Sequence, residues 1–524
     1  MAAKNETSSR LLPKAQPALD IDREEAAPVS RSRLRMINGA LGVTTAVLLS
    51  LILLRDRGSN EVTAFLGLTL LVLLVFYLFY RDVKRYRPAL VADTRKIVLL
   101  AFLLLLTVVV SVFFRAIFAL LAEALKLDAT TVGYALPVAA GAMLVSLLLD
   151  FHLALAFSFV SSLLLGILFH NDPLIPFFYF TTSIMAALYV IRCRKRTVVL
   201  RAGAMTAVVG FVAIIAIDLS RGILLVQGGI DLVAGLVGST ITVMLVSVTL
   251  PFFEAVFDIA TDIKLLELLD PNQPLLKELV YKTPGTYHHS IVIGNLSEAA
   301  AEAIGENPLL ARVGAYYHDV GKAQKPEYFI ENQRADENKH DRLTPSMSSL
   351  IITAHVKDGI EMARHHQLPS VVVDIISQHH GNSLIAYFYQ KAKEHHPLGV
   401  VSELDFRYPG PRPRTKVAAI VMLADAVEAA SRTLIDPSPH RIQGVTSSVI
   451  TRIFLDDQLS MCDLTLKDLR VIAKSFNMIL NGIFHHRIDY PGIEFPGAKK
   501  RSENPDKKHP EEAGVSAAGH TGEP

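Results

Sequence analysis

The stretch LLARVGAYYHDVGK, residues 309–322, joins a helical apolar pattern to a His-Asp dipeptide at its end. The apolar residues recur at helical spacing: Leu309, Leu310, Val313, Ala315 and Tyr316. We therefore predict a helix that ends at His318 and Asp319, followed by a turn at Gly321. A buried helix that ends in two such side chains indicates a metal site, because imidazole and carboxylate are common ligands of iron, manganese and zinc.

Histidine is concentrated around this stretch. Fourteen of the 18 histidines lie between Tyr287 and His486, in the only long segment that is not predominantly apolar. Several of them adjoin another histidine or an aspartate. Two cysteines, Cys193 and Cys462, stand alone, so neither a disulfide nor a thiolate site is predicted.

The segment before this region has the composition of a membrane protein. The 524 residues are 51% hydrophobic and 19% charged. A membrane-spanning helix needs about 17 to 25 apolar residues. Eight candidate spans are predicted, at 36–54, 62–80, 97–124, 133–149, 152–170, 174–192, 201–219 and 222–250. The junctions at 150–152 and 220–221 are tight, so seven spans with a re-entrant turn stay open.

Basic residues predict the orientation. Lys and Arg cluster before the first span, after the second span at 81–96, and after the sixth at 192–201. Short basic loops stay in the cytoplasm. An even number of spans places all three clusters and the C-terminal region on that one side, so both termini are expected to be cytoplasmic, and the protein is expected in a bacterial inner membrane.

The domain boundaries follow from these patterns. We expect a disordered tail over 1–30, a transmembrane domain over 31–250, a connecting helix over 251–283, a catalytic domain over 284–497 and a second disordered tail over 498–524. The first 30 residues lack the apolar core of a signal peptide. Arg115 and Asp218 fall within spans, where each either senses a ligand or snorkels to the interface.

The catalytic domain is predicted to be all-α. No period of two is sustained beyond Pro284, whereas helical periodicity bounded by Gly and Pro recurs at 289–304, 308–318, 345–365, 369–380, 415–434 and 465–485. The candidate metal ligands lie in or at the ends of these segments: His289, His318, Asp319, His355, His379, His380 and Asp425. Residues so far apart in sequence meet only if the helices pack as a bundle. In a two-metal site Asp319 would bridge the metals, and a water between them would attack a phosphate ester.

The same reasoning excludes other residues. His340-Asp341 is a second His-Asp dipeptide in a polar context and is not expected to bind metal. His288 would point about 100° away from His289 on a helix, so only one of the two can face the site. The pairs at 365–366, 395–396 and 485–486 are ordinary half-buried histidines in our interpretation. Lys322 either meets a phosphate oxygen, as a catalytic residue beside Asp319, or is a solvated lysine in a turn.

Longer stretches resemble one family. They are GTYHHSIVIGNL at 285, YYHDVGK at 316, SSLIITAHVKDG at 348, LPSVVVDIISQHHGN at 368, YPGPRPRTKVAAIVMLADAVEAASR at 408 and LTLKDL at 464. This order resembles the HD-domain phosphohydrolases, and within them the membrane receptors with an intracellular HD hydrolase domain. The resemblance implies hydrolysis of cyclic di-AMP to linear pApA at a di-iron or di-manganese centre held by the seven residues named above.

Two differences limit what the resemblance implies. The HD-GYP phosphodiesterases of cyclic di-GMP have a Gly-Tyr-Pro stretch after the His-His pair, and here His380 is followed by Gly381, Asn382 and Ser383. Most relatives have a large extracellular domain after the first span, where this chain has only residues 55–61. Extracellular sensing is therefore in doubt.

Other functions stay open at this point. One alternative is a different nucleotide phosphohydrolase, acting on cyclic di-GMP, a dNTP or a guanosine polyphosphate. Another is a nucleotide-binding receptor without turnover. The expected partners are a cyclic dinucleotide and membrane lipid, with no DNA or RNA polymer. Self-association into a homo-oligomer is left open.

Overall fold

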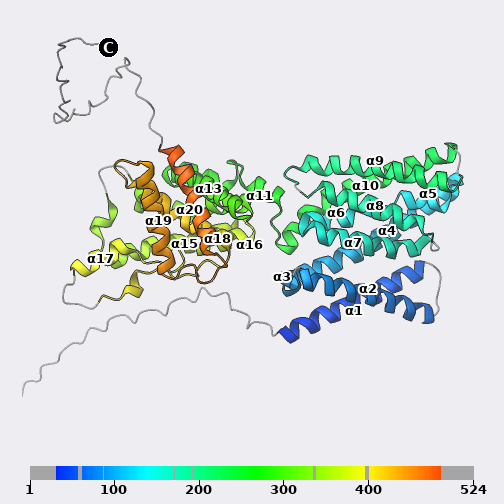
Figure 1. The fold of residues 1–524 in the computed structure, drawn as a ribbon, viewed down its shortest axis with the longest axis horizontal. Coiled ribbons are helices and arrows are strands. Elements are labelled where there is room, and N and C mark those ends of the chain that lie inside the picture. Colours follow the sequence, from blue (N-terminus) through cyan, green and yellow to red (C-terminus); the bar gives the residue numbers. More distant parts are fainter. Residues whose placement is uncertain are drawn as a thin grey trace, which may run out of the picture.

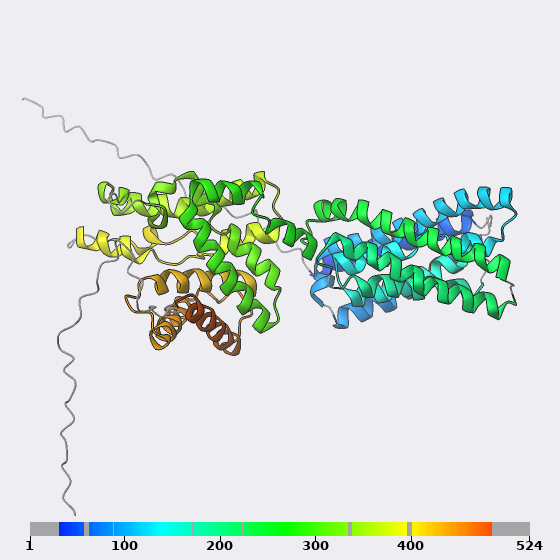
Figure 2. The ribbon, with the colours of Figure 1, turned by 90° about the horizontal axis from the view of Figure 1, so that it is seen from above.

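The chain folds into two helical units placed end to end, as both views of the computed structural model show (Figures 1 and 2). The structure describes residues 31–56, 62–86, 88–169, 172–191, 193–222, 225–333, 338–395 and 401–484. These parts contain α and 3-10 helices and one isolated β-bridge between Leu384 and Arg407. The predicted all-α fold class is confirmed. Both predicted tails, over 1–30 and 498–524, lie outside the described residues.

The first unit is a bundle of long apolar helices. They are α1 (Arg31–Asp56), α2 (Val62–Tyr86), α3 (Pro88–Ala92), α4 (Thr94–Leu125), α5 (Ala129–Tyr134), α6 (Ala139–Leu148), α7 (Phe151–Gly166), α8 (Leu174–Tyr189), α9 (Arg196–Ser220) and α10 (Leu225–Phe257). Within the described ranges, seven helical segments are long and apolar enough to cross a membrane, with α5 and α6 forming one segment, Ala129–Leu148. The protein is a multi-pass membrane protein.

Helix α8 accounts for the difference between the eight predicted spans and the seven that meet the length criterion. It is apolar but has 16 residues, which corresponds to about 24 Å of helix, against a bilayer core of about 30 Å. In Figure 1 it lies alongside its neighbours α6 and α9 as one further pass. Among the described residues seven spans meet the length criterion, and eight crossings, with α8 as the additional span, stay a prediction.

A helix cap explains the tight junction at 150–152. The carboxylate of Asp150 accepts a hydrogen bond from the backbone N–H of Leu153 at 3.0 Å and so begins α7 directly after α6. Asp93 caps α4 in the same way through Arg95. The junction at 150–152 is therefore a turn between two antiparallel helices. A re-entrant segment is not needed to explain it.

Asp218 does not snorkel. Its side chain lies near the end of α9 but is only 5% exposed, and its two carboxylate oxygens accept no hydrogen bond from the described part of the chain. The snorkelling interpretation is therefore wrong for this residue, which faces protein. Arg115 is half-buried in α4.

The expected connecting helix over 251–283 is instead broken into three pieces. Pro251 lies inside α10, which ends at Phe257, and two short helices follow: α11 (Asp262–Leu268) and α12 (Pro274–Lys282). The hydroxyl of Thr261 caps α11 and Pro274 begins α12, so each break has a local cause. Apolar periodicity alone did not reveal these breaks.

The segment 258–283, which we call the connection, contacts both the membrane bundle and the catalytic unit. The guanidinium of Arg196, at the start of α9, donates two hydrogen bonds, of 2.9 and 2.7 Å, to the Glu267 carboxylate on α11. Two further contacts reach the catalytic unit. The Tyr317 hydroxyl donates to the carbonyl of Leu268, and the carboxylate of Asp258 accepts from the backbone N–H of Ser370. The connection thus touches the two segments that lead to His318 and His379.

The second unit has eight α-helices among its described residues. They are α13 (Pro284–Ile304), α14 (Pro308–Tyr317), α15 (Pro345–His365), α16 (Ser370–Gln378), α17 (Ala386–His395), α18 (Lys416–Arg432), α19 (Pro439–Leu455) and α20 (Leu466–Ile483). Short 3-10 helices occupy Val320–Gln324, Pro326–Tyr328, Ile330–Asn332, Lys339–Arg342 and Glu403–Phe406. Six of the α-helices fall on the six predicted segments. The sequence patterns missed α17 and α19.

Helix α18 forms the centre of this unit. All eight residues from Val417 to Ala424 are buried, and α18 packs against α13, α14, α16 and α19. A helix that is apolar all round is expected at the centre of a domain. Its central position brings Asp425 to the place where the other helices converge.

A reporter enzyme that is active only outside the cytoplasm tests the arrangement of the passes. Inserted within residues 56–60, which join α1 to α2, it should be active, and inserted at 193–195 it should be inactive, because the basic loops stay with the catalytic unit. Enzyme activity in whole cells measures both. An inactive first fusion with an active second one would reverse the proposed orientation.

Candidate metal centre

Five helices deliver the seven predicted side chains to one place. His289 lies on α13, His318 and Asp319 follow α14, His355 lies on α15, His379 and His380 follow α16, and Asp425 lies on α18. His318, Asp319, His355 and His379 are at most 2% exposed. The structure therefore brings together every residue that the sequence singled out as a metal ligand.

The seven side chains divide into two groups. Asp319, His355, His379 and His380 form one group, and His289, His318 and Asp425 form the other. Within each group the candidate ligand atoms lie within 4.8 Å of one another. Each group contains histidine and carboxylate, so each can hold one transition metal.

Asp319 lies between the two groups. Its Oδ2 atom is 3.1 Å from Nε2 of His318 and 3.7 Å from Nε2 of His289. Its Oδ1 atom is 3.3 Å from Nε2 of His355 and 3.6 Å from Nε2 of His379. One carboxylate oxygen thus faces each group, which is the geometry of a bridging ligand.

Backbone carbonyls orient three of the histidine rings. The Nδ1 atoms of His318, His355 and His379 lie 2.7, 2.6 and 2.7 Å from the carbonyls of Ala315, Ile352 and Ile376. A carbonyl only accepts, so each Nδ1 carries the proton and each Nε2 keeps its lone pair for a metal. All three carbonyls belong to the residue three positions earlier, which lies within α14, α15 or α16.

The Glu428 carboxylate orients the ring of His289, as the backbone carbonyls orient the other three rings. Its Oε2 atom is 2.7 Å from Nδ1 of His289, and its Oε1 atom accepts from Nε of Arg432 at 2.6 Å. Glu428 is 3% exposed and lies one turn after Asp425 on α18. It therefore holds the His289 ring with Nε2 toward Asp425, at 3.2 Å.

Two buried atoms lack a protein partner. Neither Nε2 of His318 nor Oδ1 of Asp319 makes a hydrogen bond within the described residues. Buried polar atoms normally have partners, and exceptions require an explanation. A cation between these groups would satisfy both atoms, so the donor set fits two transition metals.

The protonation states of the site's side chains also favour the binding of cations. Burial lowers the pKa of His355 to about 3, so its imidazole is neutral at physiological pH. Burial would raise the pKa of Asp319, but the neighbouring His318 and Lys322 outweigh it and hold that pKa well below its usual range. Burial opposes protonation of His289, yet hydrogen bonds to Asp425 and Glu428 raise its pKa to about 9. A metal bound here would take the place of that proton.

Lys322 is buried in a charge network. Its side chain is 12% exposed, and Nζ lies 2.7 Å from Oδ2 of Asp319 and 2.9 Å from Oε1 of Glu331. It also lies over the ring of Phe329, 5.1 Å from the centroid. The interpretation of Lys322 as a solvated lysine is therefore wrong. An ammonium has three N–H donors, so one remains beyond these two contacts.

Gly321 is needed for the helices to approach. A Cβ atom at this position would lie 1.9 Å from the carbonyl oxygen of His355 and 2.5 Å from the backbone N of Gly359. The sequence predicted a turn at Gly321, and the absence of a side chain there permits a close approach. The structure shows that the backbone of α15 makes it, and this contact sets His355 against Asp319.

The excluded histidines lie elsewhere. His288 is exposed on α13, as expected from its position beside His289. His340 is buried, with Nε2 2.8 Å from the carbonyl of Tyr328, and Asp341 is 66% exposed. The interpretation of the pairs as half-buried is wrong for His365 and His366, which are exposed at the end of α15, and for His395, which is exposed at the end of α17. Residues 396, 485 and 486 lie outside the described residues.

Three functional neighbours were missed by sequence reasoning. They are Glu331, Glu428 and Tyr408, whose ring stacks on His380 with centroids 4.2 Å apart. Glu428 could have been found, because it follows Asp425 by three residues on one predicted helix and a buried carboxylate needs a partner. Glu331 and Tyr408 lie outside the predicted helices, where periodicity gives no information.

Glu428→Ala should weaken metal binding about 10- to 100-fold, because the His289 ring loses the group that orients it. Competition with a fluorescent chelator measures this affinity. Glu298→Ala is the matched control, since Glu298 on α13 pairs with Arg312 away from the site and should leave the affinity unchanged. Equal affinities for the two variants would show that Glu428 does not position a ligand.

Comparison with known proteins agrees with this architecture. The family described as "7TM receptor with intracellular HD hydrolase" matches residues 62–261, and the family described as "HD domain" matches residues 286–430. The first match covers the membrane bundle from α2 to the connection. The second contains all seven candidate ligands.

Two curated relatives have the name cyclic-di-AMP phosphodiesterase PgpH. The protein from Bacillus subtilis is 42% identical over 374 residues, which is 70% of this chain and 52% of the relative. The protein from Listeria monocytogenes is 38% identical over 367 residues, or 69% and 50% of the two chains. The chain thus spans about half the length of the curated relatives it matches.

A solved structure is also similar. The crystal structure of the L. monocytogenes PgpH HD domain in complex with cyclic-di-AMP is 48% identical, covering 41% of this chain and 100% of that one, with a TM-score of 0.39. The two family matches follow one another along the chain, the first over the membrane bundle and the second over the histidine-aspartate site. In these two regions the chain is similar to the 7TM receptors with an intracellular HD hydrolase.

Proposed function

We propose that this protein is a membrane-anchored, metal-dependent phosphodiesterase that hydrolyses cyclic di-AMP to linear pApA and so lowers the cytoplasmic second messenger. The observation that carries the proposal is the position of Asp319, with one carboxylate oxygen toward each of two ligand groups. The proposed ligands are the seven residues His289, His318, Asp319, His355, His379, His380 and Asp425. Iron or manganese is the proposed metal.

Bound metals would supply the central chemistry. They would hold the phosphodiester in place and lower the pKa of a water, which would then act as the nucleophile near neutral pH. The protein residues make this arrangement rigid. Asp319 fixes the spacing of the two groups, and the carbonyls behind His318, His355 and His379 fix their rings. Such preorganised ligands need little rearrangement during the reaction.

Lys322 is the proposed contact to the substrate phosphate. Two of its three donors hold Asp319 and Glu331, and the third is left for a phosphate oxygen. Its positive charge, buried beside the site, would stabilise the negative charge that develops on the phosphate during attack. The same charge keeps Asp319 ionised, so Lys322 supports both the metals and the substrate.

Cyclic di-AMP is the proposed substrate because both curated relatives are named for its hydrolysis. The family match extends through the catalytic unit as far as residue 430, which includes every proposed ligand. The orientation with the catalytic unit in the cytoplasm, where the basic loops are expected, gives the site access to a cytoplasmic nucleotide.

Substrate preference tests this proposal. Cyclic di-AMP and cyclic di-GMP share the same ring of two phosphodiesters, so the metals alone do not distinguish them. A site that hydrogen-bonds one base rejects another, because its buried polar groups stay unpaired. We expect kcat/KM for cyclic di-AMP to exceed that for cyclic di-GMP by at least about tenfold, or about 1.4 kcal/mol in transition-state binding.

The assay offers cyclic di-AMP, cyclic di-GMP and pApA to the full chain in parallel and identifies products by chromatography. Accumulation of pApA from cyclic di-AMP is the expected outcome. Similar rates on the two cyclic dinucleotides, or a preference for cyclic di-GMP, would contradict the proposed substrate. Rapid hydrolysis of pApA would contradict the proposed product.

A further inference from the structure

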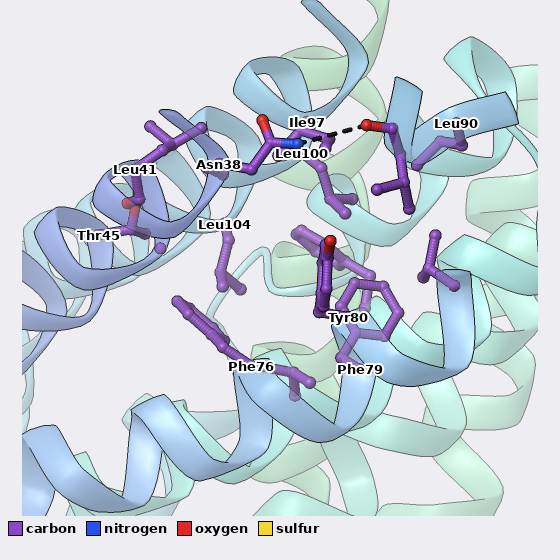
Figure 3. Close-up of a pocket in the computed structure, with 16 residues that line it drawn as sticks. Asn38, Leu41, Thr45, Phe76, Phe79, Tyr80, Leu90, Ile97, Leu100 and Leu104 are labelled. Carbon is purple, nitrogen blue, oxygen red and sulfur yellow. Dashed lines mark hydrogen bonds between the residues drawn. The ribbon is translucent and has the colours of Figure 1, made fainter. Parts of the chain in front are cut away.

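The membrane bundle contains an apolar pocket that the catalytic site does not use. It lies between the α1–α2 hairpin and helices α3, α4 and α7 and is a partly open cavity of about 130 Å³. In Figure 3, Phe76, Phe79 and Tyr80 line it from α2, and Asn38, Leu41 and Thr45 line it from α1. We call it the hairpin pocket. A void of about 150 Å³ is large enough for benzene, so a segment of a hydrocarbon chain fits here.

The chain does not fill this space with its own side chains. Gly42 lines the hairpin pocket, and a Cβ atom at this position would meet no atom within 4 Å. Helix α2 has only two residues buried among those that the structure describes, Val72 and Val83. Several of its apolar residues, including Leu70 and Leu74, are exposed. The hairpin pocket therefore adjoins the surface that faces lipid, and acyl chains have access to it.

One polar atom in the hairpin pocket lacks a partner. Asn38 is 9% exposed, and its amide nitrogen donates to the carbonyl of Val91 at 3.3 Å. Its Oδ1 atom is buried and accepts no hydrogen bond from the residues that the structure describes. Thr45 is satisfied, because its hydroxyl donates to the carbonyl of Leu41 at 2.8 Å. The lining is thus apolar apart from Asn38, Thr45 and Tyr80, and it includes one buried amide oxygen that lacks a partner within the described residues.

Basic side chains surround the end of the hairpin pocket that lies beside the catalytic unit. Tyr80 and Val83 line the hairpin pocket at the end of α2 that lies beside the catalytic unit, and Ile97 lines it near the start of α4. The adjacent exposed residues are predominantly basic: Arg81, Lys84, Arg85, Arg95 and Lys96. Two carboxylates lie among them, the exposed Asp82 and also Asp93, which pairs with Lys96 at 3.4 Å. Basic pockets between helices on the cytoplasmic side attract anionic lipid head groups.

We propose that the hairpin pocket binds an anionic phospholipid from the leaflet on the catalytic side. One acyl chain occupies the apolar cavity, and the lipid phosphate lies at the basic ends of α2 and α4. A hydroxyl of the glycerol-type head group donates to Oδ1 of Asn38. The positive-inside rule accounts for the basic residues alone, but it accounts neither for the cavity beside them nor for the unpartnered amide oxygen.

Lipid retention on the full chain tests this site. The delipidated protein is offered phosphatidylglycerol and phosphatidylcholine with identical acyl chains, and bound lipid is counted by native mass spectrometry. We expect one tightly retained phosphatidylglycerol and about a tenfold preference for it, which corresponds to about 1.4 kcal/mol. Equal retention of the two lipids would overturn the proposal, because any hydrocarbon would then fill the gap.

Two glycines on α1 give a matched pair of variants. Gly42→Leu places a side chain in the hairpin pocket and should reduce phosphatidylglycerol retention about tenfold. Gly39→Leu lies one turn earlier on the same helix, outside the pocket lining, and its Cβ also meets nothing within 4 Å. It should retain lipid like the unmodified protein. Both changes replace a helical glycine, so both should fold.

The charge is tested separately by Lys84→Gln with Arg85→Gln, which should abolish the preference between the two lipids while acyl binding remains. Equal loss of lipid in the Gly42→Leu and Gly39→Leu proteins, or an unchanged preference after the charge substitutions, would contradict the site. None of these residues belongs to the metal centre. The result is therefore independent of the proposed phosphodiesterase activity.

Discussion

The catalytic unit depends on one buried carboxylate that is shared between two groups of histidines. Asp319 is 1% exposed, and burying an ionised carboxylate is costly unless cations and hydrogen bonds compensate for it. Lys322 provides one compensating charge, at 2.7 Å. The two ligand groups on either side are placed so that bound metals would provide the rest. Five helices must therefore converge on Asp319, and the close contact at Gly321 and the central position of α18 both serve this convergence.

The same centre is connected to the membrane bundle. Tyr317 precedes His318 and donates its hydroxyl to the carbonyl of Leu268 in α11. Asp258, directly after α10, accepts from the N–H that begins α16, the helix that ends before His379. Arg196 joins the base of α9 to α11 through Glu267. A displacement of the membrane helices would therefore reach segments that carry candidate ligands of both groups.

The sequence predicted much of this arrangement because the relevant signals are local. Apolar periodicity located six of the helices of the catalytic unit, and the order of histidine and aspartate identified all seven side chains that meet. Contacts between residues that lie far apart in the sequence could not be predicted from these local patterns. The carboxylate of Glu331 becomes relevant only when its loop folds against Lys322, and Tyr408 only when its loop stacks on His380. The breaks in 251–283 follow from caps at Thr261 and Pro274, which a purely apolar pattern does not reveal.

Metal content per active chain tests the bridging role of Asp319 most directly. Elemental analysis of purified protein that hydrolyses cyclic di-AMP should find two transition metals per chain. Asp319→Ala should lose metal and turnover together, because both groups share this carboxylate, whereas Asp341→Ala, in the exposed second His-Asp dipeptide, should retain both metals. One metal or none per chain in active protein, or equal losses in the two variants, would contradict the two-metal centre.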